Sequence, residues 1–353
     1  MRQVIRIAIA ATAALALTAC STPTTPAAPA ASGSSAPASS APAANVKVGL
    51  AFDVGGRGDQ SFNDSAIVGL EKAKAEFGVE TKEAAATAGE AESAREERLN
   101  QLVDAGFDNV VAVGFAYATA VGKVAKENPD VKFAIVDDAS EASTGANIMN
   151  LTFAANQGSF LVGAAAALKT KSDHIGFVGG VETDLIKAFG AGYSAGAKAV
   201  KPDIKIDTKY LTQPPDFSGF NSVDKGKAAA EGMYQNGVDI VFQAAGGSGG
   251  GVFTAAKAAK KWAIGVDSDQ AKTAAPAVQS VIITSMIKRV DTGVYTFIKS
   301  IHDGTFKAGN TVFDLKVDGV GYSTTGGMMD DIKDKLEAYK ADIISGKISV
   351  PEK

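Results

Sequence analysis

Two kinds of segment alternate along the chain after residue 45. Short runs rich in valine and isoleucine predict strands over 46–52, 109–115, 131–137, 174–180, 204–211, 238–246, 262–267 and 281–287. Between them, apolar residues at spacings of three and four predict amphipathic helices over 64–77, 90–105, 155–169, 187–200, 224–236 and 251–260. Because apolar strands that alternate with helices are typical of parallel sheets covered on both faces, we predict an α/β fold.

Most of the predicted strands end in glycine or aspartate. These positions are Asp53 to Gly56, Gly114, Asp137 and Asp138, Gly179 and Gly180, Gly246 and Gly247, and Asp267. The carboxyl ends of parallel strands meet at one edge of a sheet, where open α/β folds bind their ligands. Glycine and aspartate are also common turn formers. Six strands that end this way nevertheless favour a shared polar rim.

The chain after the N-terminal region is longer than one hydrophobic core usually serves, and the strands suffice for two sheets. We therefore predict two lobes, formed by 45–151 with 281–306 and by 152–280 with 307–353. The connections between the lobes are expected near 149–153, 268–282 and 306–312. Two lobes with a cleft between their strand ends are typical of a binding protein.

The first 20 residues indicate a lipoprotein signal peptide. Arg2 and Arg6 precede an apolar run that is too short to span a bilayer permanently, and small residues come before Cys20. This pattern resembles a bacterial lipobox, so we expect Cys20 to be lipidated and to anchor the protein outside the cytoplasmic membrane. An ordinary signal peptide with an incidental cysteine is the alternative. Residues 21–44 are almost entirely serine, threonine, proline and alanine, and predict a disordered tether.

Composition excludes several classes of function. Of the 35 basic residues, Arg2 and Arg6 lie in the predicted signal, so 33 remain against 39 acidic residues, a net charge of about −6. This balance argues against a nucleic-acid partner. Cys20 is the only cysteine, and His174 and His302 form no ligand motif, so we expect no disulfide and no zinc site.

One motif suggests an enzyme. Residues 246–250, GGSGG, fit the G-x-S-x-G pattern of a hydrolase nucleophile after a strand and before a helix, and Asp267 and His302 follow Ser248 in the order of a triad. So many glycines leave the turn too open to strain the serine, and His302 lies at the end of a helical pattern. A glycine turn that lets main-chain N–H groups approach a ligand is the other interpretation.

Aromatic residues are scarce, and three of them lie close to predicted strand ends. Phe62 follows the first turn, Tyr117 follows the second strand, and Phe189 comes after Gly179 and Gly180. Most phenylalanines lie in the core, but two in opposite lobes can sandwich a flat ring, with about 1 kcal/mol per face beyond area burial.

Charged residues at the same strand ends suggest a hydroxyl-bearing ligand. A carboxylate at Asp53, Asp137 or Asp267 accepts hydrogen bonds from two vicinal hydroxyls, and an ammonium at Lys288 donates to hydroxyl oxygens. Together with the aromatic residues, these groups predict a site for a neutral ligand that has both a flat ring and hydroxyls.

The chain resembles the basic-membrane-protein lipoproteins, which are PnrA-like substrate-binding proteins of ABC transporters, from about residue 46 to 321. The segments that carry the resemblance are DVGG…DQSFN (53–63), 114–138, HIGFVGGVETDLIKAFGAGYSAGAKAV (174–200), FQAAGGSGGGVFTAAK (242–257), AIGVDSDQ (263–270) and TSMIKRVD (284–291). The resemblance implies a type I periplasmic-binding-protein fold, with two Rossmann-like lobes, parallel central sheets and a hinge of crossing segments.

Characterised members of this family bind nucleosides, which implies a ligand site built from eight residues. They are Asp53, Phe62, Asn63, Asp137, Phe189, Gly246, Asp267 and Lys288. Phe62 and Phe189 are expected to stack on the base from opposite sides, with Asn63 and Asp137 hydrogen-bonded to its edges.

The resemblance also implies places in the same cleft for the remaining four residues. Asp53, Asp267 and Lys288 would lie near the ribose, and Gly246 would offer a main-chain contact. Three segments depart from the usual family pattern and leave the base preference open: 182–186, 212–220 and 222–227.

We therefore expect a lipid-anchored, monomeric receptor that captures a nucleoside, with a purine favoured, and delivers it to an ABC permease and its ATPase. It needs no cofactor and no catalytic residue, because binding free energy alone closes the lobes. A binding protein for a sugar, an autoinducer or a flavin is the alternative within this class. A serine esterase, a nucleoside hydrolase and a surface sensor are the alternatives from other classes.

Overall fold

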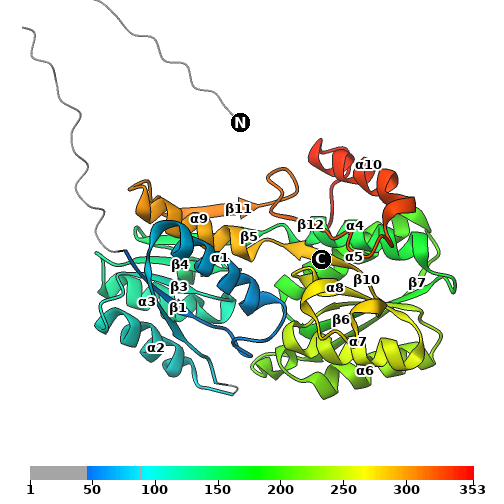
Figure 1. The fold of residues 1–353 in the computed structure, drawn as a ribbon, viewed down its shortest axis with the longest axis horizontal. Coiled ribbons are helices and arrows are strands. Elements are labelled where there is room, and N and C mark those ends of the chain that lie inside the picture. The colour runs from blue at the N-terminus through cyan, green and yellow to red at the C-terminus, as the bar shows by residue number, and fades with distance from the viewer. Residues whose placement is uncertain (1–45, 88) are drawn as a thin grey trace, which may run out of the picture. The chain divides into compact units, whose positions relative to one another are not determined.

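A computed structural model describes residues 46–87 and 89–353. The predicted signal peptide, Cys20 and the predicted tether lie outside these residues, so they stay predictions. The described residues form two six-stranded sheets, each covered by helices (Figure 1). The predicted α/β architecture with two parallel-sheet lobes is confirmed.

The first sheet has the order β11-β5-β4-β3-β1-β2, and all its neighbouring strands are parallel. Its strands are β1 (Lys47–Ala51), β2 (Glu80–Ala84), β3 (Asn109–Ala112), β4 (Lys132–Val136), β5 (Ile148–Phe153) and β11 (Gly309–Phe313). The helices of this lobe are α1 (Phe62–Phe77), α2 (Glu92–Asp104), α3 (Ala118–Glu127) and α9 (Val290–His302). Helix α1 packs against α9, and α2 packs against α3. We call these elements lobe 1.

The second sheet has the order β12-β10-β9-β8-β6-β7, in which only the edge strand β12 is antiparallel to its neighbour. Its strands are β6 (His174–Val181), β7 (Lys205–Thr212), β8 (Ile240–Ala244), β9 (Trp262–Asp267), β10 (Ile282–Lys288) and β12 (Val320–Tyr322). The helices of this lobe are α4 (Ala155–Lys169), α5 (Asp184–Val200), α6 (Val223–Gln235), α7 (Gly249–Ala259), α8 (Gln270–Thr273) and α10 (Lys333–Ile344). We call these elements lobe 2.

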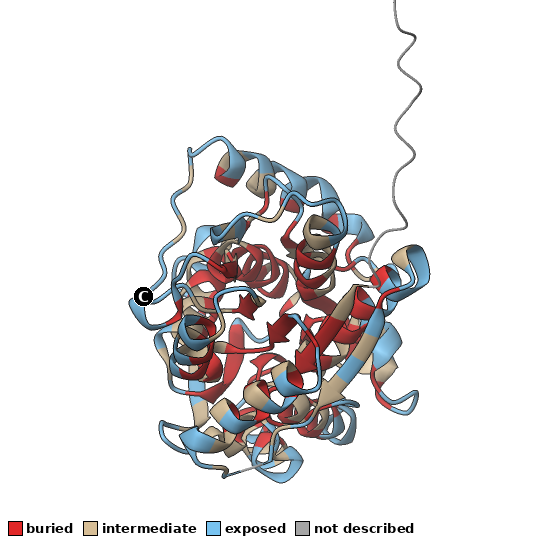
Figure 2. Ribbon diagram, turned by 90° about the vertical axis from the view of Figure 1, so that its left-hand side faces the viewer, coloured by how far each residue is buried: buried red, intermediate tan, exposed pale blue. Residues whose placement is uncertain are grey.

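The central strands are largely buried and the edge strands are not, but burial explains only in part which strands the sequence predicted. The buried strand β5 was missed, and the partly exposed edge strand β7 was predicted. Strands β3, β6 and β8 are buried along their whole length. By contrast, β2 and β11 are polar and partly exposed, so neither shows an apolar run, and β12 is only three residues long. Figure 2 shows the buried sheets inside a shell of partly exposed helices.

The predicted lobe boundaries are wrong at two of the three crossings. The first crossing follows β5 near residue 154, close to where we expected it. However, β10 pairs with β9 in lobe 2, so the second crossing lies between β10 and α9 rather than within 268–282. Strand β11 pairs with β5 in lobe 1, so the third crossing lies at 314–319. An apolar run predicts a strand but not its sheet, because pairing partners are chosen in three dimensions.

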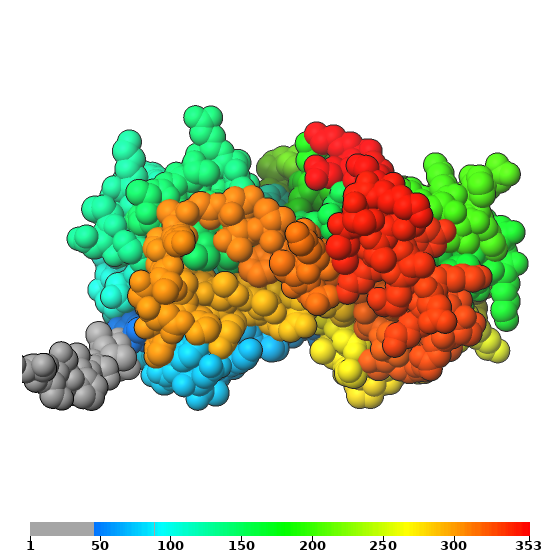
Figure 3. All heavy atoms as spheres, turned by 90° about the horizontal axis from the view of Figure 1, so that it is seen from above, coloured from blue at the N-terminus to red at the C-terminus, as the bar shows by residue number. Residues whose placement is uncertain are grey.

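The last part of the chain packs on both lobes, on the side where the crossings between them lie. Seen from above, α9 and β11 lie over lobe 1, and α10 lies over lobe 2 (Figure 3). With the three crossings, this arrangement ties the lobes together at one end of the sheets and leaves the carboxyl ends of the strands facing the cleft.

Helices α4 and α5 approach each other closely, which explains their many alanines and glycines. A Cβ added to Gly196 would lie 1.9 Å from the carbonyl oxygen of Phe160, and one added to Gly163 would lie 2.0 Å from that of Tyr193. Glycine is required at these positions for close packing and not for its backbone freedom.

We expect Gly196→Ala to lower the free energy of unfolding by about 1–3 kcal/mol, because the added methyl has to push two backbones apart. Urea unfolding followed by circular dichroism measures this change. Gly232→Ala in α6 is the matched control, since a Cβ there meets no atom within 4 Å. That substitution should stabilise by roughly 0.5–1 kcal/mol, because alanine is the better helix former. Equal effects of the two substitutions would contradict the packing argument.

Candidate functional site

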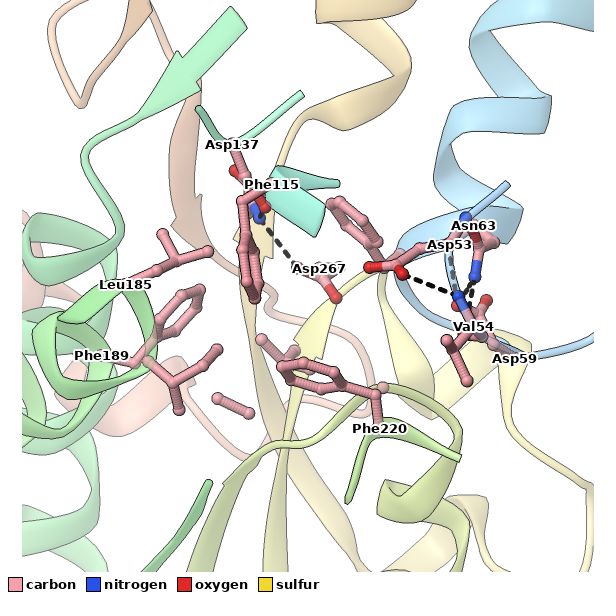
Figure 4. A pocket seen from close by; sticks show the side chains of 16 residues that line it. Asp53, Val54, Asp59, Asn63, Phe115, Asp137, Leu185, Phe189, Phe220 and Asp267 are labelled. Atoms are coloured by element: carbon pink, nitrogen blue, oxygen red, sulfur yellow. Dashed lines mark hydrogen bonds and ion pairs between the residues drawn. The ribbon is translucent and has the colours of Figure 1, made fainter. Parts of the chain in front are cut away.

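The eight residues predicted to bind a ligand all line one cavity between the lobes (Figure 4). Including its open mouth, the cavity contains about 520 Å³ of space free of protein atoms. It is also lined by residues that we did not predict: Val54, Asp59, Phe115, Leu185, Ile186, Phe220, Ala244 and Val266. Residues from both lobes contribute, so the cavity is complete only when the lobes are together.

Asp53 lies just beyond the carboxyl end of β1, and the local backbone fixes its side chain. The N–H of Val54 donates to Asp53 Oδ1 at 2.7 Å, and the N–H of Asp53 donates to Asn63 Oδ1 at 3.0 Å. The other carboxylate oxygen lies against Gly114, where a Cβ would be only 2.5 Å from Asp53 Oδ2. Gly114 has φ +105°, so a glycine is needed there both for the backbone and for the space.

Asn63 is engaged within the turn that precedes α1. Besides accepting from Asp53, its amide donates to Asp59 Oδ2 at 3.2 Å and to the carbonyl of Val54 at 3.5 Å. Asp59 accepts from the backbone N–H groups of Ser61, Asn63 and Asp64, which otherwise have no helical partner at the start of α1. The turn is therefore held by its own side chains.

Asp137 and Asp267 occupy equivalent places at the ends of parallel strands β4 and β9. Both have left-handed backbone conformations, with φ +67° and +61°, which few residues other than glycine adopt but which aspartate tolerates. This conformation turns both side chains into the cavity, where they are only 4% and 7% exposed. Backbone strain of this kind is concentrated at functional sites.

Lys288, at the end of β10, joins the carboxylates of the two lobes. Its ammonium pairs with Asp137 Oδ2 and lies 4.0 Å from Asp267 Oδ1. Within the described part of the chain, Asp137 Oδ1 is buried and accepts no hydrogen bond. Buried polar atoms are usually paired, so this oxygen is an acceptor available to a ligand.

Four phenylalanines contribute to the apolar lining of the cavity. Lys288 Nζ lies 4.5 Å from the ring centroid of Phe62 and 5.7 Å from that of Phe189, so both predicted rings lie near this ammonium. Phe115 and Phe220 line the same cavity and contact each other edge-on at 6.4 Å.

No pattern in the sequence singles out Phe115 or Phe220, although Phe115 directly follows Gly114 at the end of a predicted strand. Tyr117, which we did consider, lies in the core of lobe 1. Its hydroxyl donates to the carbonyl of Phe52 at 2.8 Å and accepts from Arg98. The short helix at 115–117 therefore presents Phe115, and not Tyr117, to the cavity.

Burial raises the pKa of the carboxyl groups that line the cavity. For both Asp53 and Asp267 the pKa rises from 3.8 to about 6, mainly because the charged form loses its hydration. The Val54 N–H limits the rise at Asp53, and Lys288 limits it at Asp267. Burial also raises the pKa of Asp137, against the attraction of Lys288.

Direct hydrogen bonds at and beside Asp267 also join the two lobes. Ser61 Oγ of lobe 1 donates to Asp267 Oδ2 at 2.6 Å, and Ser268 Oγ of lobe 2 donates to the carbonyl of Ser61 at 3.0 Å. Gln270 Nε2 donates to the carbonyl of Gln60 at 3.0 Å. The structure is thus a closed form of the two lobes.

The residues of the possible hydrolase triad do not come together. Ser248 is fully buried, where its hydroxyl donates to the carbonyl of Gly219 at 2.7 Å and accepts from the N–H of Ser222 at 2.6 Å. His302 lies at the end of α9, stacked on Phe77 at 4.4 Å. Asp267 contacts Ser61 and Lys288 instead. The geometry does not support a nucleophilic serine.

Comparison with known proteins identifies the family. The sequence model of the family described as "ABC transporter substrate-binding protein PnrA-like" matches residues 46–353. The chain belongs to this family. It is 39% identical over 324 residues to the CD4+ T-cell-stimulating antigen of Listeria monocytogenes, covering 87% of this chain and 88% of that protein. It is 37% identical over 325 residues to the ABC transporter nucleoside-binding protein BmpA of Lactococcus lactis, with 88% and 90% covered.

Solved structures agree with this assignment. A solute-binding protein of an ABC transporter from Aeropyrum pernix superimposes with a TM-score of 0.75 at 28% identity, covering 87% of this chain and 94% of that one. The predicted type I periplasmic-binding-protein fold is therefore confirmed. As a PnrA-like substrate-binding protein of an ABC transporter, the chain binds a small molecule outside the cytoplasm and works with a permease and an ATPase. The family consists of binding proteins rather than enzymes.

In residues 46–87 and 89–353, no helix combines the length and the apolar character needed to cross a membrane.

The raised pKa of Asp53 predicts a pH-dependent stability. Between about pH 4 and 6 the native state holds a proton that the unfolded chain releases, so the contribution of Asp53 to the free energy of unfolding falls as the pH rises through this window. Raising a carboxyl pKa from 3.8 to about 6 corresponds to about 3 kcal/mol.

We therefore expect Asp53→Asn to be more stable than the wild type at pH 7.5, by up to about 3 kcal/mol, with the difference lost below pH 4. Urea unfolding at a series of pH values measures it. Asp216→Asn on the surface of lobe 2 is the control, because the pKa of Asp216 is lowered and the sign of its pH dependence is opposite. A stability difference between Asp53→Asn and wild type that does not change with pH would overturn the assignment.

Proposed function

We propose that this substrate-binding protein captures a nucleoside, with a purine favoured, between its two lobes and delivers it to the permease. The observation that carries the proposal is one cavity in which aromatic rings from both lobes lie beside a cluster of carboxylates and one ammonium. A nucleoside has the matching parts, a flat base and a ribose with vicinal hydroxyls. The Lactococcus lactis relative is named as a nucleoside-binding protein, which supports the same ligand class.

The base is proposed to stack between Phe62 and Phe189. Both rings lie near the ammonium of Lys288, on opposite lobes, so closing the lobes brings an aromatic face to each side of a flat ligand. Leu185 and Ile186 at the start of α5 extend the apolar wall on the Phe189 side. Stacked aromatic pairs contribute roughly 0.5–1.5 kcal/mol beyond the area that they bury.

The carboxylates are proposed to accept the hydroxyl and N–H groups of the ligand. The unpaired Oδ1 of Asp137 suits the edge of the base, while Asp53 and Asp267 suit the ribose hydroxyls. Gly246, at the end of β8, contributes a main-chain contact. Three carboxylates beside one ammonium also disfavour an anionic ligand, so the site suits a nucleoside better than a nucleotide.

Two of the expected roles change in view of the contacts. Both amide hydrogens and the amide oxygen of Asn63 are used within the turn, so we propose that Asn63 positions Asp53 rather than contacting the base. Lys288 lies over the face of Phe62, where the base would stack. We propose that its ammonium turns toward the ribose as the base enters, still paired with Asp137.

The functional consequence of ligand binding is the closure of the two lobes. A ligand that contacts both lobes binds the closed form more tightly than the open form, and this difference in affinity shifts the population toward closure. We propose that the permease recognises the closed form, that the protein acts as a monomer, and that lipidated Cys20 holds it at the membrane. No chemical step is part of this cycle.

Removing either half of the site should weaken binding. We expect Phe62→Ala and Asp267→Ala each to raise the dissociation constant for adenosine or inosine about tenfold to a hundredfold, through loss of stacking or of charge-assisted hydrogen bonds. Isothermal titration calorimetry measures this change, and circular dichroism checks that both variants are folded. Phe77→Ala, a ring of α1 outside the cavity, is the control. Unchanged affinity in both site variants would refute the site assignment.

A thermal-shift screen identifies the ligand class directly, since any ligand of the native state raises the melting temperature. We expect nucleosides to stabilise the protein, and free bases, ribose and nucleotides to do so much less. A sugar, an autoinducer or a flavin that gave the largest shift would replace the proposed ligand. Chromatography of a nucleoside after long incubation with the protein should recover it intact. Released base would instead show a nucleoside hydrolase.

A further inference from the structure

A loop of lobe 2 lies beside the cavity and contacts lobe 1. This 213–222 loop contains a short helix, Phe217–Phe220, whose two phenylalanines contact Phe115 of lobe 1 edge-on, with ring centroids 5.8 and 6.4 Å apart. The guanidinium carbon of Arg95, also in lobe 1, lies 5.7 Å from the ring centroid of Phe217. We call Phe115, Phe217 and Phe220 the interlobe aromatic cluster.

Phe217 differs from the other two members in one respect. Phe115 and Phe220 line the cavity, whereas Phe217 does not. Its ring is half-buried, and its aromatic and cationic neighbours, Phe115 and Arg95, both belong to lobe 1. Separation of the lobes would expose this ring to water, so its burial favours the closed form without any contact to the ligand.

Hydrogen bonds within lobe 2 hold the loop in place. Thr212 Oγ1 donates to the carbonyl of Asp216 at 2.6 Å, and the Asp216 carboxylate accepts from the N–H of Ser218 at 2.9 Å. Ser248 then bridges the end of the loop, donating to the carbonyl of Gly219 and accepting from the N–H of Ser222. The short helix is therefore a rigid support for Phe217.

The surface that receives Phe217 is equally fixed within lobe 1. Arg95 is 6% exposed and pairs with Glu92 at 3.1 Å, and its Nε lies 3.7 Å from Glu90. Glu90 also pairs with Arg98, whose guanidinium donates to Tyr117 Oη at 2.8 Å. These contacts keep the guanidinium plane in place, so Phe217 gains a cation–π contact at little cost in side-chain entropy.

We propose that Phe217 is a positioning residue that holds the closed form, and that Ser248 acts through it by fixing the 213–222 loop. The serine of the GGSGG segment thus contributes a buried hydroxyl for loop geometry, not a nucleophile. Because the cluster forms only as the lobes meet, its loss should speed ligand release more than it slows capture. This inference rests on the cavity being the ligand site, but not on the ligand being a nucleoside.

The test follows lobe closure and ligand release separately. In the full chain with Cys20→Ser, cysteines introduced as Ala105→Cys on lobe 1 and Ala258→Cys on lobe 2, both exposed positions, carry spin labels. We expect Phe217→Ala to shift the distance distribution toward open forms and to raise the dissociation rate of adenosine about tenfold, with the association rate changed less than twofold. The melting temperature of the protein without adenosine should stay the same.

Further variants separate positioning from packing. Phe217→Tyr should restore slow release because it keeps the ring, and Val223→Ala, a half-exposed neighbour just beyond the loop, should change nothing. Ser248→Ala should speed release in the same direction, and combined with Phe217→Ala it should add no further effect, since both act through one contact. Additive effects would overturn the role of Ser248.

A distance distribution and a release rate that are both unchanged in Phe217→Ala would overturn the proposal for Phe217. A wild type that does not bind adenosine, guanosine or inosine would instead contradict the proposed ligand. In that case the closed fraction, measured with the ligand that the thermal-shift screen selects, still decides the role of Phe217.

Discussion

The buried ammonium of Lys288 is the interaction on which the cavity depends. It comes from the last long strand of lobe 2, pairs with Asp137 of lobe 1 and lies 4.0 Å from Asp267 of its own lobe. Three buried carboxylates and no cation would be very costly, because desolvation of a charge is repaid only by a partner at close range. The closed form therefore depends on β10 of lobe 2 bringing this lysine to the end of β4 of lobe 1.

The backbone around the ammonium is built to bring acidic groups to it. Asp137 and Asp267 adopt left-handed conformations at the ends of their strands, and Gly114 leaves the space that the Asp53 carboxylate fills. Burial raises the pKa of Asp53 and Asp267 to about 6 because the charged form loses its hydration, and at Asp267 the attraction of Lys288 offsets this only in part. Asp137 Oδ1 accepts no hydrogen bond from the described residues, and we propose that a donor group of the ligand pairs with it.

Closure uses two sets of contacts that differ in chemistry. On one side of the cavity, Ser61 and Ser268 join the lobes through hydrogen bonds around Asp267. At the mouth, the interlobe aromatic cluster joins them through rings and one guanidinium. Hydrogen bonds are directional and aromatic contacts tolerate small shifts, so the first set fixes how the lobes align and the second closes the cavity beside them.

The sequence by itself determined the alternation of strands and helices, the polar rim at the strand ends and, through the family resemblance, eight residues of one cavity. Each of these depends on local pattern or on a motif. It could not determine the sheet to which β10 and β11 belong, the contribution of Phe115 and Phe220, or the engagement of Asn63 within its turn. Those depend on which segments meet across the hinge, and contacts between residues far apart in the chain are decided by the packing of both lobes together.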